Sequence, residues 1–370
     1  MKKDLFVRIS VFAVLVTLGT AFPAGVAFAQ DQKGNGQFML LQEEAKPMFA
    51  TLPPRYLENV LAPATPTVTN WTGSLGSGLT SFTMVGTDPS TTNVTTTVTA
   101  YIIPIAFVFS PTPNGIFDPH HVLPNGRTVI QNVAASPIFN SGIDFVQGGT
   151  DLGNTQYIDA FQRGNFFAFV STNTNYHVLL NLVVLPEQFI VVPPASGSIA
   201  TEFGVRAGLV DINFFDAKLQ QIISSNSTIT PNSFPIALTY DTYLTSGGGC
   251  CIGGYHSAFG SASAPQTYAH FTYIGKAGAF SQDVSALSHE TGEWVDDPFI
   301  NNPGCGGLLE VGDPLEGGPN FGGFPYTLNG FTYNLQDLVF AQYFGQSPST
   351  SVHGWFSFQN ANLSVCSNGQ

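Results

Sequence analysis

Thr, Val and aromatic residues alternate or run together over much of the first half of the chain. Within a strand-like stretch at residues 71–109, residues 92–109 read T-N-V-T-T-T-V-T-A-Y-I-I-P-I-A-F-V-F. Alternation that passes into a continuous apolar run is typical of strands with at least one buried face. We therefore predict a β-rich region over residues 67–200, with a short helix at 155–165 and strands at 166–172, 177–185 and 189–193.

The second half of the chain mixes helical and strand-like patterns. An amphipathic helix is expected at residues 211–224, and the clearest helix at 283–295, where Pro298 ends it. Strands are expected on either side of a loop rich in Gly and Cys, and again near the end of the chain, at 234–244, 266–274, 331–344 and 355–358. The sequence thus predicts an α+β region over residues 201–370, preceded by the β-rich region and a lead-in segment at 30–66.

The first 29 residues have the pattern of a secretory signal peptide. Three basic residues come first, an apolar run follows from residue 9 to about 18, and Ala27 and Ala29 are the small residues that signal peptidase reads. We predict cleavage between Ala29 and Gln30, which makes the protein secreted, extracellular or periplasmic. A membrane anchor is the alternative, but the run is shorter than the roughly 20 residues that cross a bilayer. The mature form is therefore expected to carry no membrane anchor.

Charge changes this picture in two ways. Without residues 1–29, which hold three basic residues and one acidic residue, 8 basic and 23 acidic residues remain, a net charge of −15. Such a surface argues against nucleic acid as a partner. No Lys or Arg follows Lys276, whereas nine acidic residues do. A bound cation or a solvated acidic face would both account for this segment. The nine are Asp283, Glu290, Glu293, Asp296, Asp297, Glu310, Asp313, Glu316 and Asp337.

The chain has four cysteines, an even number, which favours two disulfides in an exported protein. They should tie the C-terminal region together, and three connectivities stay open. A zinc–thiolate site is the competing interpretation, but no Cys-x-x-Cys spacing supports it. The cysteines are Cys250, Cys251, Cys305 and Cys366.

The stretch S-H-E-T-G-E-W-V-D-D-P within the helix at 283–295 carries the candidate chemistry. On a helix, His289 and Glu293 lie at i and i+4 and point to one face, which lets both grip one ion. This geometry underlies the zinc-binding His-Glu-x-x-His pattern, here with Glu in place of the second His. Glu290 is then placed to act as a general base. The order of elements over residues 205–297 is also the order that a zincin-type catalytic half would need.

A site of this kind needs a further protein ligand from a later element. Glu310, in L-L-E-V-G-D-P-L-E-G, is the first candidate, and Asp313 and Glu316 are second choices or supporting partners. One His and two carboxylates favour Zn²⁺, but Mn²⁺ and Ca²⁺ stay open as alternatives.

An ordinary acidic helix is the competing interpretation of the motif. Asp283 would cap the helix, Glu290 and Glu293 would be solvated, and Trp294 would pack. Gly292 costs a helix roughly 1 kcal/mol relative to Ala, so a close approach of the backbone to another element or a ligand would explain it. His256, in G-G-Y-H-S, could assist the same site, although a lone His is more often structural.

Other chemistries find little support. No Gly-x-Ser-x-Gly elbow is present. Gly247–249 opens no helix after a strand, which argues against a phosphate-binding loop. His120 and His121 lie in a turn with Asp118, an arrangement more typical of a surface pair than of a ligand set.

Several motifs together resemble the exordium-like (phosphate-induced protein) family. They are C-C-I-G-G-Y-H-S-A-F, L-S-H-E-T-G-E-W-V-D-D-P-F-I-N-N, L-L-E-V-G-D-P-L-E-G and Y-T-L-N-G-F-T-Y, in that order, within residues 240–340. The resemblance implies a metal-type constellation more than a settled reaction. The family's Cys in the Glu-x-x-Asp element is replaced here, so its disulfide partners do not transfer. The residues implicated are His256, His289, Glu290, Glu293, Glu310, Asp313 and Glu316.

Two functions follow as hypotheses. The first is an exported zincin-like metallohydrolase that acts on a peptide or protein substrate. His289, Glu293 and Glu310 would hold the metal, Glu290 would be the base and His256 a helper in catalysis. The second is a non-catalytic extracellular protein in which the acidic cluster binds a structural cation. The fold expected in either case is α+β, a β-rich N-terminal region followed by a zincin-like C-terminal region with a metal-binding helix.

Overall fold

The computed structural model describes residues 67–74, 81–305 and 307–366 in full. It also describes the backbone of four strands, β1 (Val26–Gln30), β2 (Gln37–Leu41), β3 (Met48–Thr51) and β4 (Arg55–Leu57). The predicted signal peptide lies outside the described residues except where β1 begins. Within the described part of the chain, no helix is long and apolar enough to cross a bilayer.

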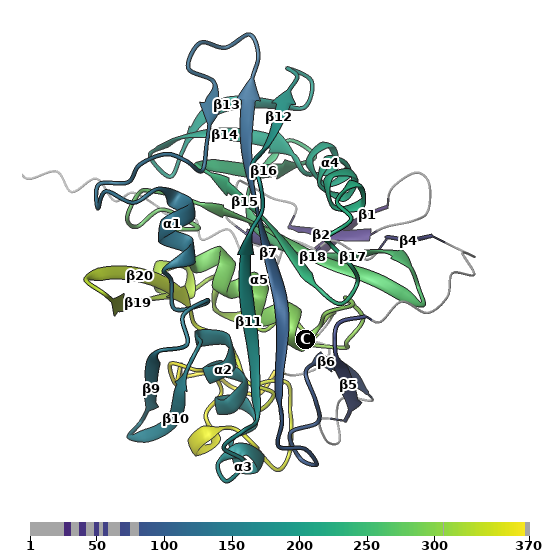
Figure 1. Ribbon diagram of the computed structural model, residues 1–370, viewed down its shortest axis with the longest axis vertical. Helices are drawn as coiled ribbons and strands as arrows, with labels where there is room; N and C mark the ends of the chain where they lie inside the picture. The colour runs from purple at the N-terminus through teal and green to yellow at the C-terminus, as the bar shows by residue number, and fades with distance from the viewer. Residues whose placement is uncertain are drawn as a thin grey trace, which may run out of the picture.

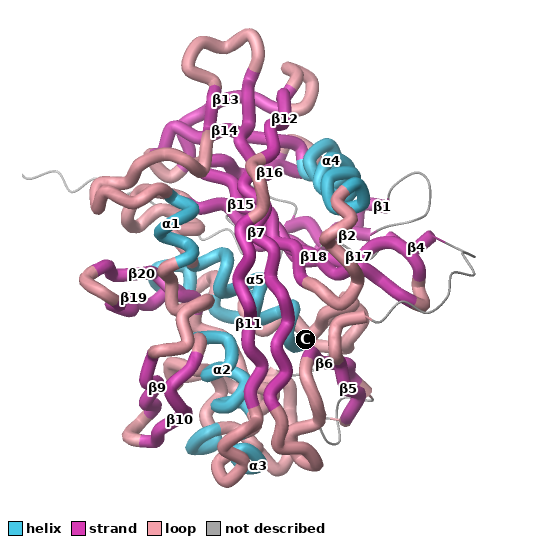
Figure 2. Tube along the Cα trace, viewed as in Figure 1, coloured by secondary structure: helices cyan, strands magenta, loops and turns pink. Residues whose placement is uncertain are grey.

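A curled mixed sheet of twelve strands forms the centre of a strand-rich protein with few helices (Figure 2). Four of the twelve strands lie off the main path: β12 (Gln188–Val192) and β8 (Ile116–Phe117) pair with β7, while β3 and β4 pair with β17. The strand order along the main path is β11 (His177–Val184), β7 (Thr95–Phe109), β15 (Phe234–Tyr240), β18 (Ala264–Tyr273), β17 (Gly249–Ser261), β16 (Thr242–Ser246), β14 (Val205–Asp211) and β13 (Gly197–Glu202).

The sheet joins the two halves of the sequence. β7 pairs in parallel with β15, with Ile102 opposite Ile236, and β15 pairs in parallel with β18. The strands that follow are antiparallel, β18 to β17 and β17 to β16. The long strands β7 and β11 run along the molecule in Figure 1. Strands from the predicted β-rich region and from the predicted α+β region therefore belong to one sheet.

In the part of the chain that the structure describes, five α-helices and three hairpins pack around the sheet. The helices are α1 (Val129–Ala134), α2 (Tyr157–Asn165), α3 (Phe167–Val170), α4 (Ile212–Ser225) and α5 (Ser285–Asp296). The hairpins are β5 (Asn70–Gly73) with β6 (Phe82–Val85), β9 (Ile143–Gln147) with β10 (Thr150–Thr155), and β19 (Gly323–Leu328) with β20 (Phe331–Gln336). Short 3₁₀ turns lie at Asp313–Leu315, Pro319–Gly322 and Val352–Gly354.

Each face of the sheet has its own apolar core. On β15, Ile236 belongs to the core that contains α5, whereas its neighbour Ala237 belongs to the core that contains α4. This alternation follows from the period of two along a strand. α5 is buried along its whole length, and Trp294 stacks on Phe234 while its indole N–H donates to Thr267. The motif helix is therefore a central element of the core rather than a solvated acidic helix.

Many predicted elements are confirmed. The long strand pattern becomes β5, β6 and β7, the amphipathic helix becomes α4 with Asp211 as its N-cap, and the motif helix becomes α5, which ends just before Pro298. Asp283 is not the cap of α5. The N-cap is Val284, and the Asp283 carboxylate instead accepts hydrogen bonds from the backbone of Val284 and Asn334.

Three predicted elements are wrong. Within residues 166–172, Phe167–Val170 form the helix α3 and not a strand, and this one helical turn buries both its N-cap Phe166 and Val170. The loop rich in Gly and Cys is the strand β17, whose glycines hide the usual alternation. Residues 355–358 form only an isolated bridge through Ser357.

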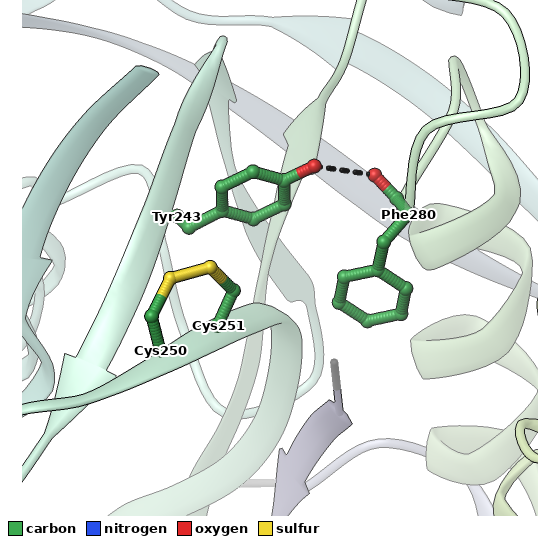
Figure 3. Close-up of a disulfide and its surroundings, with 4 residues drawn as sticks. All are labelled: Tyr243, Cys250, Cys251 and Phe280. Carbon is green, nitrogen blue, oxygen red and sulfur yellow. Dashed lines mark hydrogen bonds between the residues drawn. A yellow bond between two sulfur atoms is a disulfide. The ribbon is translucent and has the colours of Figure 1, made fainter. Parts of the chain in front are cut away.

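The prediction of two disulfides is confirmed, with Cys305 joined to Cys366 and Cys250 joined to Cys251. The first ties the end of the chain to the loop after α5. The second links sequence neighbours and closes no larger loop. Figure 3 shows it beside Tyr243, whose hydroxyl donates to the carbonyl oxygen of Phe280 at 2.7 Å.

Candidate metal centre

α5 places three of the predicted site residues. His289 and Glu293 are one helical turn apart, and His289 Nε2 lies 3.0 Å from Glu293 Oε1. Glu290 follows His289 and is fully buried. Gly292 lies on the same helix against Leu338, so closely that a β-carbon at 292 would overlap the Leu338 side chain. This close approach accounts for a glycine in the middle of a buried helix.

β17 brings His256 to the same place. Its side chain faces α5, and its Nδ1 lies 3.4 Å from Glu290 Oε2 and 3.6 Å from Glu293 Oε2. Gly254, two residues earlier on the same face, makes room for Glu290. A β-carbon there would come within 2.6 Å of Glu290 Oε1. Gly254 interrupts the hydrophobic alternation that would mark β17 as a strand in the sequence, and its missing side chain leaves the space that Glu290 occupies.

The loop after α5 supplies the remaining acidic residues. The backbone N–H of Gly312 donates to Glu293 Oε1 at 3.1 Å, which holds the loop against the helix. Asp313 Oδ1 then lies 3.4 Å from His289 Nε2. Glu310 is buried near Glu293. Glu316 is half-buried and belongs to neither ligand group described next.

Two groups of ligand atoms overlap at Glu293. In one, the ligand atoms of His256, Glu293 and Glu310 all lie within 4.8 Å of one another, and in the other those of His289, Glu293 and Asp313 do. The structure thus brings all the first-choice residues together but divides them differently from the predicted set. Among the described residues, Glu310 is grouped with His256, while Asp313 takes the third place beside His289.

Burial dominates the electrostatics of these carboxylates. The side chains of Glu290, Glu293 and Glu310 are at most 5% exposed. Burial, followed by repulsion from neighbouring carboxylates, raises the pKa of all three well above the ordinary range. Such groups either hold protons or lie beside a cation that replaces the protons.

Burial lowers the pKa of His256, whereas it raises the pKa of the carboxylates. The pKa of His256 is lowered to about 3, first by burial and then by His289. The imidazole is therefore neutral at physiological pH, which is the form that coordinates a metal ion.

Glu310 provides a test of whether a cation fits. Its side chain is buried, and neither carboxylate oxygen accepts a hydrogen bond from an N–H or hydroxyl group of the described residues, so that its polar neighbour is another carboxylate, that of Glu293. A buried polar group without a partner costs about 1–3 kcal/mol, and more when it is charged. The ion pairs recorded for the cluster are made by His256 and His289, and none by a described Lys or Arg. A divalent cation would satisfy the Glu310 oxygens and balance the charge.

Two other groups of side chains have atoms that could bind a metal ion, but one is exposed and the other contains a disulfide. His120 contacts Asp118 at 3.3 Å and Glu187 at 2.9 Å, yet 54% of its side chain is exposed, which agrees with the predicted surface pair. Glu202 lies near Cys250 and Cys251, whose sulfurs are joined to each other.

A cavity of about 420 Å³ lies between the loop before α1, the end of β18 with the loop after it, and the start of β20. Tyr273, Gln282, Asp283 and Phe331 are among its lining residues, and none of the lining residues belongs to the cluster.

The sequence pointed to side chains that the structure brings together as possible metal ligands, but Gly254 and Gly312, which leave space for Glu290 and His289, were missed. Gly312 directly precedes Asp313, and Gly254 lies two positions before His256. This closeness in the sequence to predicted site residues could have pointed to both glycines. Comparisons with protein-family models, with curated proteins and with solved structures find no match to the chain.

Proposed function

We propose that the protein is an exported metal-dependent hydrolase of zincin-like type that acts on peptide bonds at the cluster around Glu293. The observation that carries the proposal is the position of Glu290. It lies inside the buried cluster, 3.4 Å from His256, but belongs to neither group of ligand atoms. A carboxylate held beside a ligand set, rather than within it, is placed to move a proton.

The residues have separable roles in this proposal. Glu293 and its partners His256, His289, Glu310 and Asp313 would hold the metal, with Zn²⁺ favoured and Mn²⁺ or Ca²⁺ as alternatives. When bound, the ion would supply Lewis-acid polarisation of a substrate carbonyl. Glu290 would accept a proton from the water molecule whose oxygen attacks the substrate carbonyl carbon, and would return it to the amine nitrogen as the C–N bond breaks. Its close neighbour His256 would position that carboxylate.

Export rests on the predicted signal peptide and on chemistry that favours an oxidising compartment. All four cysteines are paired in disulfides, and disulfides persist mainly outside the cytosol.

A second candidate function has its own support. His256, Glu290, Glu293 and Glu310 are almost completely buried, and only Asp313 has a partly exposed side chain, at 32%. A structural cation needs no path for a substrate, so this enclosure favours a non-catalytic extracellular protein that holds an ion for stability. Membership of the exordium-like family, proposed from the order of motifs, is consistent with either function.

Metal content and one conservative variant distinguish the two functions. The purified chain and Glu290→Gln are analysed by inductively coupled plasma mass spectrometry and assayed on a mixed library of quenched fluorescent peptides. Zinc or manganese in both proteins, with hydrolysis only in the wild type, supports the enzyme. Bound ion without hydrolysis in either protein supports the structural role. Absence of any bound ion contradicts both.

A further inference from the structure

The two oxygens of the Glu293 carboxylate face different histidines. Oε1 lies 3.0 Å from His289 Nε2, and Oε2 lies 3.6 Å from His256 Nδ1. Oε1 also accepts one hydrogen bond from Gly312, but a carboxylate oxygen has a second lone pair. One carboxylate thus has an available oxygen toward each of two imidazoles.

Each histidine has a separate acidic partner. Glu310 completes the group on the His256 side, and Asp313 completes the group on the His289 side. The single-ion site predicted from the sequence requires His289 and Glu310 to contact the same ion. Among the described residues, these two side chains fall in different ligand groups. The side chains are therefore arranged as two sets that share Glu293.

From this arrangement we propose that the cluster binds two divalent cations, bridged by the Glu293 carboxylate. One ion lies between His256, Glu293 and Glu310, and the other between His289, Glu293 and Asp313. Ions about 3.5–4 Å apart with a shared ligand are typical of two-metal hydrolases. The inference rests on the proposed metal centre but not on its catalytic role.

Charge supports two ions over one. Glu290, Glu293, Glu310 and Asp313 bring four carboxylates into the cluster, and three of them are at most 5% exposed. One divalent ion would leave two negative charges in a buried site, where unpaired charge is costly. Two divalent ions match the charge of the four carboxylates.

The acidic residues alone would not establish a site. The independent observation is Glu310, which is buried and directed into the cluster, where neither of its oxygens accepts a hydrogen bond from an N–H or hydroxyl group of the described residues and its polar neighbour is the Glu293 carboxylate. His256 faces the same group and is fully buried, so this half of the centre offers both an imidazole nitrogen and a buried carboxylate to one ion.

The first test is the number of ions in the intact wild-type chain. The purified protein is dialysed against Mn²⁺, freed of excess ion and analysed by elemental and native mass spectrometry. We expect two equivalents per chain, together with the electron paramagnetic resonance spectrum of an exchange-coupled manganese pair. One equivalent, or two with the spectrum of isolated ions, would overturn the two-ion proposal. One equivalent with peptide hydrolysis would leave the proposed function intact, whereas no bound ion would defeat both.

Variants then assign the two sets. Glu310→Gln and Asp313→Asn should each lower the bound manganese from two equivalents to one and remove the coupled spectrum. Glu293→Gln should remove both ions. Asp144→Asn, which changes an exposed carboxylate that belongs to none of the candidate ligand groups, is the control and should keep two. Retention of two coupled ions in Glu293→Gln would refute the bridge. Circular dichroism checks that each variant is folded, and the wild-type measurement decides the question if one is not.

Discussion

The α-carbon of Gly312 lies against the imidazole of His289. A β-carbon at position 312 would come within 2.7 Å of His289 Cγ and closer still to the ring atoms beyond it. The same glycine donates its backbone N–H to Glu293, so one residue fixes the position of two proposed ligands.

Gly312→Ala should therefore displace His289 or the loop that carries Glu310 and Asp313. Loss of a group that orients a metal ligand typically lowers metal affinity 10–100-fold. We expect a loss in that range, measured by competition with a chromogenic chelator. Gly317→Ala is the matched control, because a β-carbon there meets nothing within 4 Å. Equal affinities in the two variants would show that the contact at Gly312 does not position the site.

Gly292→Ala tests the packing of the motif helix. Alanine favours a helix by about 1 kcal/mol over glycine, but its methyl group would overlap Leu338, and overpacking a core costs about 1–3 kcal/mol. We expect the overlap to dominate, with a net decrease in the free energy of unfolding of about 1 kcal/mol in urea titrations. Leu338→Val removes the δ-carbons that cause the overlap. The double variant should then be more stable than the sum of the two single changes implies, and simple additivity would refute the contact.

Contacts between residues close in the sequence could be predicted for this site, whereas contacts between distant residues could not. His289 and Glu293 lie one turn apart because helix geometry is local, so their spacing in the sequence was sufficient. Whether Glu310 or Asp313 lies beside His289 depends on the path of a loop across α5, which no local pattern encodes. The sequence accordingly pointed to the candidate ligands that the structure brings together, but grouped them differently.

The same limit applies to the fold. Asp159 and Arg163 are spaced for an i,i+4 pair on α2. In the structure, Asp159 instead contacts His177 at 2.6 Å, while Arg163 donates to the backbone carbonyls of Leu152 and Tyr176. These partners come from other strands and loops, so tertiary contacts replaced the local pair. β17 was missed for a related reason, since Gly254 is selected by the space that Glu290 needs and not by strand propensity.

The two disulfides should differ in their effect on stability. The bridge between Cys305 and Cys366 spans a sequence separation of 61, and a loop of this size restricts the unfolded chain strongly. Replacing both cysteines by Ala should lower the free energy of unfolding by about 2–4 kcal/mol. The pair at Cys250 and Cys251 has a sequence separation of 1, so its replacement by Ala should cost markedly less. Chemical denaturation of the two double variants measures the difference, and equal losses would contradict the loop-closure argument.

Asp283 should make stability depend on pH. Burial raises its pKa from the ordinary 3.8 to about 7, although hydrogen bonds from Val284 and Asn334 act in the opposite direction. Between these two values the folded protein keeps a proton that the unfolded chain has released. The stabilisation is complete below the unfolded pKa and is lost as the pH rises through about 7. For one proton, the free energy of unfolding falls by up to about 1.4 kcal/mol per pH unit in this window.

Asp283→Asn removes this titration and keeps an acceptor oxygen. The variant should gain stability relative to the wild type between pH 5 and pH 8, as measured by denaturant unfolding at both values. Asp144→Asn, at an exposed position, is the control and should follow the wild type. A stability difference between Asp283→Asn and the wild type that does not change with pH would show that Asp283 is not the group that titrates.

The enclosure of α5 has a kinetic consequence for any ion held beside it. Among the proposed ligands only Asp313 is partly open to solvent, and the helix beneath it is buried at every position. An ion could therefore exchange only when the loop at Asp313 opens or when part of the core unfolds. Its residence time would be set by those openings rather than by the ligand bonds alone. The identity of the ion would then be decided largely by which cation is abundant where the chain folds, and it would persist after the protein has moved to a different environment.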